Sequence, residues 1–258
     1  LVEDGRYVYP DGSEVVLWGV NFQPSIGWEY DRFVKAGLIP RGSFDQASYF
    51  MLVDAGLDEI QRLGCDVIRV TLSPHELANF DGSLRDTPNL RTLDYLMAQG
   101  RQRRIYYYFA FINELGANDN NVAGTLMEHP DGGRKIDYYS WLLDPDFIQR
   151  SQVYIGNLLT HKNRYDGIRM IDDPAFCIAE LVNEPHTPNV DDPEAFFHQY
   201  YIHWLKTKAL SDTAENFQLW RKEYTLEYIN QMCDFLERMG CQAPVAWSHK
   251  WSMAIRHN

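Results

Sequence analysis

A chain of 258 residues with 45% hydrophobic and 23% charged residues has the ordinary composition of a globular protein and is long enough for one large domain. Its 36 acidic residues outnumber its 24 basic ones, and the formal net charge of −12 disfavours binding to nucleic-acid phosphates. No apolar run approaches the ~20 residues of a membrane span, so we expect no membrane as partner. Because of the net negative charge, we expect no nucleic acid as partner either.

The chain begins at Leu1 instead of a methionine, which indicates a processed or trimmed start. We expect a secreted or extracytoplasmic protein. Its four cysteines are too few and too scattered for a disulfide framework. Cys233 and Cys241 are the only close pair, and the sequence leaves open whether they are bridged. None of the cysteines has zinc-site spacing, and we expect neither a metal nor an organic cofactor.

The first segment predicts a small hairpin, because residues 6–9 are followed by a turn at residues 10–12, and we expect it to cap the floor of a barrel. Residues 15–22 predict the first barrel strand. The residues around its end would face a pocket, and they are polar or aromatic: Asn21, Gln23, Trp28 and Glu29. Trp28 is a candidate platform for a sugar ring, although packing within the loop explains it equally well.

A helix over residues 45–63 and a second strand over residues 66–72 come next. The period of two in this strand turns Arg69 toward the barrel interior, where a cation needs a carboxylate partner. That partner is either a catalytic carboxylate, whose pKa Arg69 would lower, or Glu180 in a structural ion pair. His75 and Glu76 follow the strand and are candidates for the pocket lining.

Residues 89–102 predict another helix, and residues 105–112 predict a third strand whose exit, Asn113 and Glu114, is polar. A long loop over residues 116–141 then predicts a binding element that forms one wall of the cleft. A helix over residues 146–161 completes this part of the chain.

The centre of the sequence is the apolar run from Phe176 to Val182, which is typical of a strand buried on both faces. Pro185 cannot donate to a ladder, so the strand is expected to end at Glu184. A carboxylate would therefore lie at the C-terminal end of a parallel strand, where α/β barrels place their chemistry.

Helices over residues 193–209 and 213–239 and a fifth strand over residues 244–248 end the predicted elements. The repeated order of strand and helix predicts an α/β fold, a (β/α)8 TIM barrel of which this chain holds about the first five units. At about 50 residues a unit, a whole barrel would need roughly 400 residues. We therefore expect residues 1–258 to be a single catalytic domain that is incomplete at its C-terminus, with the remaining barrel segment beyond residue 258.

The triplet Asn183, Glu184 and Pro185 after an apolar strand resembles the acid/base strand of clan A glycoside hydrolases, most closely glycoside hydrolase family 5 and its mannanase-like and cellulase-like members. Residues 172–174, 19–22 and 204–206 extend the resemblance more weakly. The resemblance implies that Glu184 is the general acid/base and that Asn183 binds a sugar 2-hydroxyl. It also implies a retaining hydrolase of β-mannan or β-glucan whose nucleophile, on the seventh strand, has no counterpart in this sequence.

The predicted site thus has Glu184 as its catalytic residue and a set of substrate-binding candidates at strand exits: Asn21, Trp28, Arg69, His75, Asn113, Asn183, His186, Trp247 and His249. The substrate would be an oligosaccharide or a polysaccharide, and the sequence leaves mannan, cellulose, mixed-linkage glucan and β-galactosides open. The sequence also has three other interpretations. The triplet could be only a strand-ending turn. The chain could be a carbohydrate-binding or inactive barrel without a working nucleophile. A metal-dependent hydrolase is disfavoured, because the eight histidines are scattered along the chain.

Overall fold

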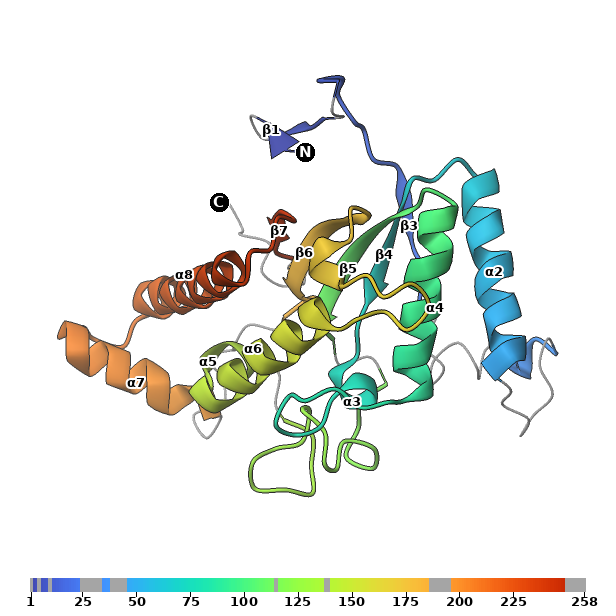
Figure 1. Ribbon diagram of the computed structural model, residues 1–258. Helices are drawn as coiled ribbons and strands as arrows, with labels where there is room; N and C mark the ends of the chain where they lie inside the picture. Colours follow the sequence, from blue (N-terminus) through green and yellow to red (C-terminus); the bar gives the residue numbers. More distant parts are fainter. Residues whose placement is uncertain are drawn as a thin grey trace.

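The computed structural model describes residues 2–3, 6–8, 11–23, 34–37, 46–113, 116–136, 140–185 and 196–248. Its main feature is a parallel sheet of five strands in sequential order: β3 (Gly19–Asn21), β4 (Val67–Thr71), β5 (Tyr106–Ile112), β6 (Phe176–Val182) and β7 (Val245–Ala246). Figure 1 shows this sheet at the centre of the molecule. The predicted α/β class, strand order and parallel direction are confirmed. In the described part of the chain β3 and β7 are the edges, so the sheet is not closed there.

The five predicted helices are present within a few residues at each end: α2 (Gln46–Arg62), α4 (Pro88–Gln102), α6 (Pro145–Thr160), α7 (Phe196–Lys208) and α8 (Ala214–Met239). Three short helical turns were not predicted: α3 (Pro74–Leu77), α5 (Ser140–Leu143) and the 3-10 turn η1 (Met170–Asp172). Thr87 and Asp144 cap α4 and α6 through their side-chain oxygens, and a proline follows each cap. Gly240 ends α8 in the left-handed conformation, with φ 79°.

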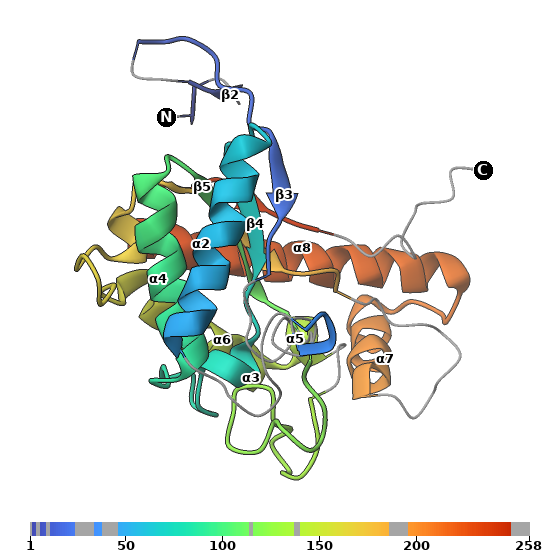
Figure 2. The ribbon, with the colours of Figure 1, turned by 90° about the vertical axis from the view of Figure 1, so that its right-hand side faces the viewer.

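The sheet has a helix side and an inner side, and the two carry different residues. On β5, Tyr107 donates its hydroxyl to the Met97 carbonyl of α4, and its ring stacks near that of Phe109. Arg69 and Tyr108 are register partners on the other side. Figures 1 and 2 show α2 and α4 side by side along one flank of the sheet. The helix side therefore forms the apolar core, and polar side chains gather on the inner side.

A β-bulge in β6 changes which of its residues face inward. Tyr107 pairs with Phe176, but the next residue of β5, Tyr108, pairs with Ile178, so Cys177 is the extra residue. Before the bulge, Phe176 packs its ring against Phe109 on the helix side. After it, Ile178 and Glu180 share the inner side with Tyr108. The bulge thus turns Glu180 inward without taking Phe176 out of the core.

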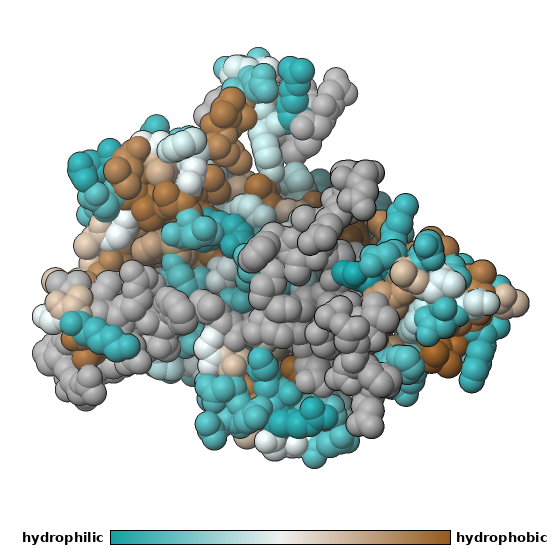
Figure 3. Space-filling view, turned by 180° about the vertical axis from the view of Figure 1, so that it is seen from behind, coloured by the Kyte–Doolittle hydropathy of each residue, from teal (hydrophilic) through white to brown (hydrophobic). Residues whose placement is uncertain are grey.

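The first and central strands are shorter than predicted. The first was expected over residues 15–22, but only Gly19–Asn21 find ladder partners, because β4 starts at Val67. Before them, Val16 and Trp18 expose large side chains. Viewed from the side opposite to Figure 1, hydrophobic surface lies between the hairpin end and a hydrophilic patch (Figure 3). The central strand ends at Val182 instead of Glu184, because Glu184 has φ 45°, which a strand cannot accommodate.

The predicted hairpin is present at the N-terminus. Val15 donates to the Tyr7 carbonyl across a turn in which Gly12 has φ 82°, and β1 (Val2–Glu3) pairs with β2 (Arg6–Tyr7). The Tyr7 hydroxyl donates to the Cys177 carbonyl at 2.9 Å, which holds the hairpin to the N-terminal end of β6. Figure 2 shows the hairpin at the opposite end of the sheet from α3. The hairpin lies at the barrel floor, as predicted, beside a cavity of about 500 Å³.

Gly19 determines how closely β3 approaches β4. A Cβ atom at this position would overlap the Val67 carbonyl oxygen, which is backbone and cannot move aside cheaply. We expect Gly19→Ala to lower the free energy of unfolding by about 1–3 kcal/mol. The matched control is Gly156→Ala in α6, where the added atom would meet Phe235 at an ordinary 3.5 Å. That variant should be more stable by up to ~1 kcal/mol, because alanine favours a helix. Urea unfolding of both variants measures the contrast, and equal effects would contradict it.

The four cysteines are free, so Cys233 and Cys241 are not bridged. Cys233 lies within α8 and Cys241 follows the Gly240 that ends it. No helix among the described residues combines the length and the apolar character that crossing a membrane requires.

Candidate active site

The candidate site lies at the C-terminal ends of the strands, the end at which α3 and the loop over residues 116–136 also lie (Figure 2). Its centre is an ion pair between β4 and β6. Arg69 donates through Nε and Nη2 to the two carboxylate oxygens of Glu180, both at 2.8 Å. Glu180 is 0% exposed and the Arg69 side chain 23%. Of the two partners that the sequence left open for Arg69, the structure therefore has Glu180.

The ion pair keeps the Arg69 guanidinium charged. Burial lowers the pKa of Arg69, but the hydrogen bonds and the negative charge of Glu180 outweigh this, and its pKa lies above the ordinary value. Tyr108 lies beside the pair, with its ring centroid 5.3 Å from the guanidinium carbon. Burial, and then the charge of Glu180, raise the pKa of the Tyr108 phenol. Arg69 is thus a fixed cation at the base of the candidate site, the open C-terminal end of the strands, which we call the mouth.

Arg69 also orients two asparagine side chains. It donates to Asn183 Oδ1 at 2.7 Å and to Asn21 Oδ1 at 3.2 Å. A guanidinium can only donate, so the Asn183 oxygen must face it and the Asn183 NH₂ group must point elsewhere. That group donates to Asn113 Oδ1 at 3.2 Å. Four predicted site residues, Asn21, Arg69, Asn113 and Asn183, therefore form one hydrogen-bonded chain across β3, β4, β5 and β6.

Asn113 ends this chain with an unused donor. The residue is only 3% exposed, and its Nδ2 has no hydrogen-bond partner among the described residues. A buried amide without a partner costs about 1–3 kcal/mol, so such groups in native proteins call for an explanation. A hydroxyl-rich ligand above Asn113 would supply the missing acceptor.

Glu184, the predicted acid, is exposed and follows directly on Asn183. Its φ of 45° is one of three positive values among the described non-glycine residues, and the other two, at Arg104 and Ala209, follow helix ends. Such a conformation costs about 1–3 kcal/mol and is kept only where the surroundings hold it. Here the Glu184 N–H donates to the Ser248 hydroxyl at 2.9 Å.

Tyr108 and Ser248 are site residues that the sequence analysis missed. Tyr108 lines a cavity of about 300 Å³ with Gly19, Val20, Asn21, Val67 and Arg69. The period of two in β5 gives a signal for Tyr108, because it alternates with the core residues Tyr107 and Phe109. The sequence gives no such signal for Ser248, because the residue to which it bonds lies 64 positions earlier in the chain.

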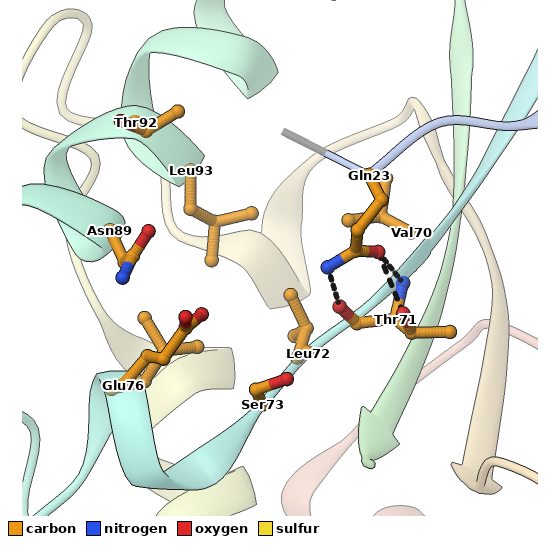
Figure 4. Close-up of a pocket in the computed structure, with 10 residues that line it drawn as sticks. Gln23, Val70, Thr71, Leu72, Ser73, Glu76, Asn89, Thr92 and Leu93 are labelled. Carbon is orange, nitrogen blue, oxygen red and sulfur yellow. Dashed lines mark hydrogen bonds between the residues drawn. The ribbon is translucent and has the colours of Figure 1, made fainter. Parts of the chain in front are cut away.

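Gln23, predicted to face the pocket, instead binds the end of β4 through its side-chain amide. Its amide makes three hydrogen bonds to Thr71: one to the carbonyl, one from the backbone N–H and one from the hydroxyl, at 2.7, 3.0 and 2.6 Å. Figure 4 shows this amide against Thr71, with Glu76 and Asn89 at the pocket between α3 and α4. The pocket, of about 30 Å³, has room for a water molecule but not for a sugar.

Trp247 lies in a different place from the one predicted for a substrate-binding residue. Ala246 is the register partner of Glu180 and shares its inner face, so the next residue, Trp247, turns to the helix side. Its ring packs 5.8 Å from that of Tyr228 in α8.

Five further residues that the sequence placed near the pocket lie outside the described residues: Trp28, Glu29, Glu114, His186 and His249.

Of the loop predicted over residues 116–141 as a wall of the cleft, the structure describes residues 116–136 as loop, and this part has a small buried core of its own. Four of its side chains are fully buried: Val122, Leu126, Met127 and Ile136. The Glu128 carboxylate accepts the Gly124 and Gly133 N–H groups, which lower its pKa. A bridge from Thr125 to Asn79 joins the loop to the chain that follows α3. The loop is therefore a fixed part of this end of the barrel.

His75 is also packed at this end, in α3, and is only 7% exposed. Burial, and then the positive charge of Arg85, lower its pKa from 6.5 to about 4. Below pH 6.5 His75 is protonated in the unfolded chain but stays neutral in the folded protein down to about pH 4. Because the unfolded chain then binds more protons, the free energy of unfolding falls as the pH drops from 6.5 to about 4. We expect unfolding experiments from pH 7 to 4 to show a smaller loss of stability for His75→Phe than for the wild type. Parallel pH profiles would contradict this expectation.

No cluster of three or more potential metal-binding side chains occurs among the described residues. Among the described residues, the candidate site brings together one exposed carboxylate, Glu184, one paired carboxylate, Glu180, and the three amides of Asn21, Asn113 and Asn183. Such a set binds hydroxyl groups and can transfer protons.

No family model matches the chain, and no curated protein does. Solved structures do match. An endo-1,4-β-mannanase from Rhizomucor miehei aligns over 93% of this chain and 58% of its own, at 17% identity and a TM-score of 0.55. An endo-β-1,4-mannanase from Thermotoga petrophila aligns over 93% of this chain and 44% of its own, at 14% identity and a TM-score of 0.59. A GH5_18 protein from Streptomyces cattleya aligns over 92% and 45%, at 16% identity and a TM-score of 0.51.

These likenesses show the fold. The five parallel strands and their helices are part of a (β/α)8 barrel of the kind found in glycoside hydrolase family 5, as the resemblance in the sequence predicted. The chain spans 58%, 44% and 45% of the lengths of these three relatives.

Proposed function

We propose that this chain carries the acid/base side of a retaining glycoside hydrolase that cleaves β-linked glycans of the mannan or glucan type. The observation that carries the proposal is the placement of Glu184, an exposed carboxylate at a strand's end beside an asparagine amide that Arg69 orients. The shared barrel fold supports a glycosidase in general. The two endo-mannanases among the similar structures favour β-mannan over other glycans.

In this mechanism Glu184 first donates its proton to the glycosidic oxygen of the leaving group while a second carboxylate attacks the sugar. Glu184 then takes a proton from the water that hydrolyses the glycosyl-enzyme intermediate. The Asn183 NH₂ group, turned away from Arg69, binds a hydroxyl of the reacting sugar. The unused Asn113 donor gives the mouth a further hydrogen bond for a hydroxyl.

Glu180 is a poor choice for the attacking carboxylate, because it is fully buried and both of its oxygens are held by Arg69. We therefore propose that the nucleophile comes from the part of the barrel that would pair with the open edges of β3 and β7. It should lie about 5 Å from Glu184, the spacing of a retaining enzyme, because an inverting enzyme needs ~6.5 to 9.5 Å. We also propose that the protein acts outside the cytoplasm, because a polymeric glycan substrate is found there.

The test is hydrolysis of β-mannan, cellulose and mixed-linkage β-glucan by the protein with its whole barrel, which is also the protein for every activity measurement below, with the anomeric form of the first product followed by NMR. We expect release of reducing ends from at least one of these β-glycans, and we expect the first product to be the β-anomer. An α-anomer would overturn the retaining mechanism. Binding of the glycan without release of reducing ends would instead favour the carbohydrate-binding or inactive barrel.

A further inference from the structure

We infer that Ser248 is a positioning residue for Glu184, and that its hydroxyl holds the acid in the conformation from which it donates a proton. The inference rests on the proposed function for its catalytic half, and on the geometry of β6 and β7 for its structural half. Nothing in the resemblance of the sequence pointed to this serine.

The Ser248 hydroxyl uses both its donor and its acceptor on one bend of the backbone. Its Oγ accepts the Glu184 N–H at 2.9 Å and donates to the Val182 carbonyl at 3.1 Å. The two groups are the last carbonyl of β6 and the amide two residues later, so a single side chain closes the bend. A methyl group in its place could do neither.

The bend needs such a clamp because of the backbone at Glu184. Arg104 and Ala209, the other described non-glycine residues with positive φ, follow α4 and α7, where left-handed residues commonly end helices. Glu184 instead follows a strand, and the hydroxyl of Ser248 is its backbone's partner. Without it, rotation to an ordinary negative φ would swing the carboxylate away from its present position.

The position of Ser248 is itself fixed by the neighbouring strand. Ala246 is in register with Glu180 on the inner face, and Trp247 packs against Tyr228 on the helix side. The next alternation brings Ser248 back to the inner face at the level of the bend. The aromatic contact outside and the hydroxyl contact inside therefore form one unit, in which Trp247 anchors the residue that clamps Glu184.

The clamp predicts a specific kinetic signature. Protonation by Glu184 matters most when the leaving group is a poor one, such as a sugar hydroxyl, and least when it is an acidic phenol that leaves unaided. A misplaced acid should therefore lower kcat/KM, which reports the step that cleaves the glycosidic bond, much more for natural glycosides than for dinitrophenyl glycosides. A variant that only loosened the fold would slow both.

The test compares Ser248→Ala with Ser248→Thr, which keeps a hydroxyl. In Ser248→Ala we expect amide exchange at Glu184, followed by NMR, to quicken about fivefold, which corresponds to a hydrogen bond of ~1 kcal/mol. We expect kcat/KM on unactivated β-glycosides to fall about 10²-fold, the scale of a 1 Å misplacement, with a much smaller change in kcat/KM on dinitrophenyl glycosides. Ser248→Thr should restore most of both quantities.

Each contrary result has a separate meaning. Unchanged exchange at Glu184 in Ser248→Ala overturns the clamp, whatever the activity. Equal losses on both kinds of leaving group, without rescue by threonine, overturn the positioning role. If the wild type hydrolyses no glycoside, the proposed function fails and the catalytic half of the inference fails with it, while the exchange measurement still decides whether Ser248 holds the bend.

Discussion

Replacing Glu184 by glutamine should lower kcat for unactivated β-glycosides by ~10² to 10⁴ and leave the fold intact, because it removes the proposed general acid from an exposed site. Glutamine has nearly the same shape, and the backbone bond from residue 184 to Ser248 is unaffected by the change. The measurement is the initial rate of reducing-end release on the glycan that the wild type cleaves best, with circular dichroism to verify folding.

Glu227→Gln is the matched control for this experiment. It makes the same chemical change on an exposed side chain of α8, and should leave kcat at the wild-type value. The acid role would be excluded by full turnover in Glu184→Gln. A loss of the same size in Glu227→Gln would show that the change reflects stability and not chemistry.

Replacing Arg69 by methionine should lower the free energy of unfolding by about 3 kcal/mol. Glu180 is 0% exposed, and without Arg69 its negative charge would have no cationic partner. We take the lower end of the ~3 to 5 kcal/mol typical of such losses, because 23% of the Arg69 side chain still contacts solvent. Denaturant unfolding at pH 7 measures the loss.

The double variant Arg69→Met with Glu180→Leu separates the lost charge pairing from lost packing. Replacing a buried ion pair by apolar residues of similar volume is often neutral or stabilising, so the double variant should be more stable than Arg69→Met alone. Arg62→Met, on the exposed pair with Glu59, is the control and should unfold as the wild type does. If the double variant were less stable than the single one, the buried charge would not be the cause.

The carboxylate at the strand's end was predictable because two local signals agree. The apolar run of β6 requires cover on both faces, and Pro185 stops the ladder. Period-two alternation likewise placed Arg69 on the inner face, where it contacts Glu180. Both features follow from residues that are close in sequence, which is why the sequence was enough for them.

The details of the site depend on contacts between distant segments, which local patterns do not contain. The positive φ of Glu184 depends on Ser248 of another strand. Trp247 was expected in the pocket because it lies near a strand's end, but the register of β7 against β6 decides its side, and that register depends on the packed sheet. Gln23 was expected to face the pocket, and the edge of β4 binds it instead.

The bulge at Cys177 divides β6 into two segments that are under separate constraints. Phe176 before it packs against Phe109 on the helix side, and Ile178 and Glu180 after it face the inner side, with the extra residue Cys177 absorbing the change of phase. A designer could therefore repack the core around Phe176 without altering the direction of Glu180. Deleting Cys177, by contrast, would force the strand back into a single phase, so that either Phe176 leaves the core or the carboxylate of Glu180 turns into it. In this strand the length of the chain is more strictly constrained than the identity of its apolar residues.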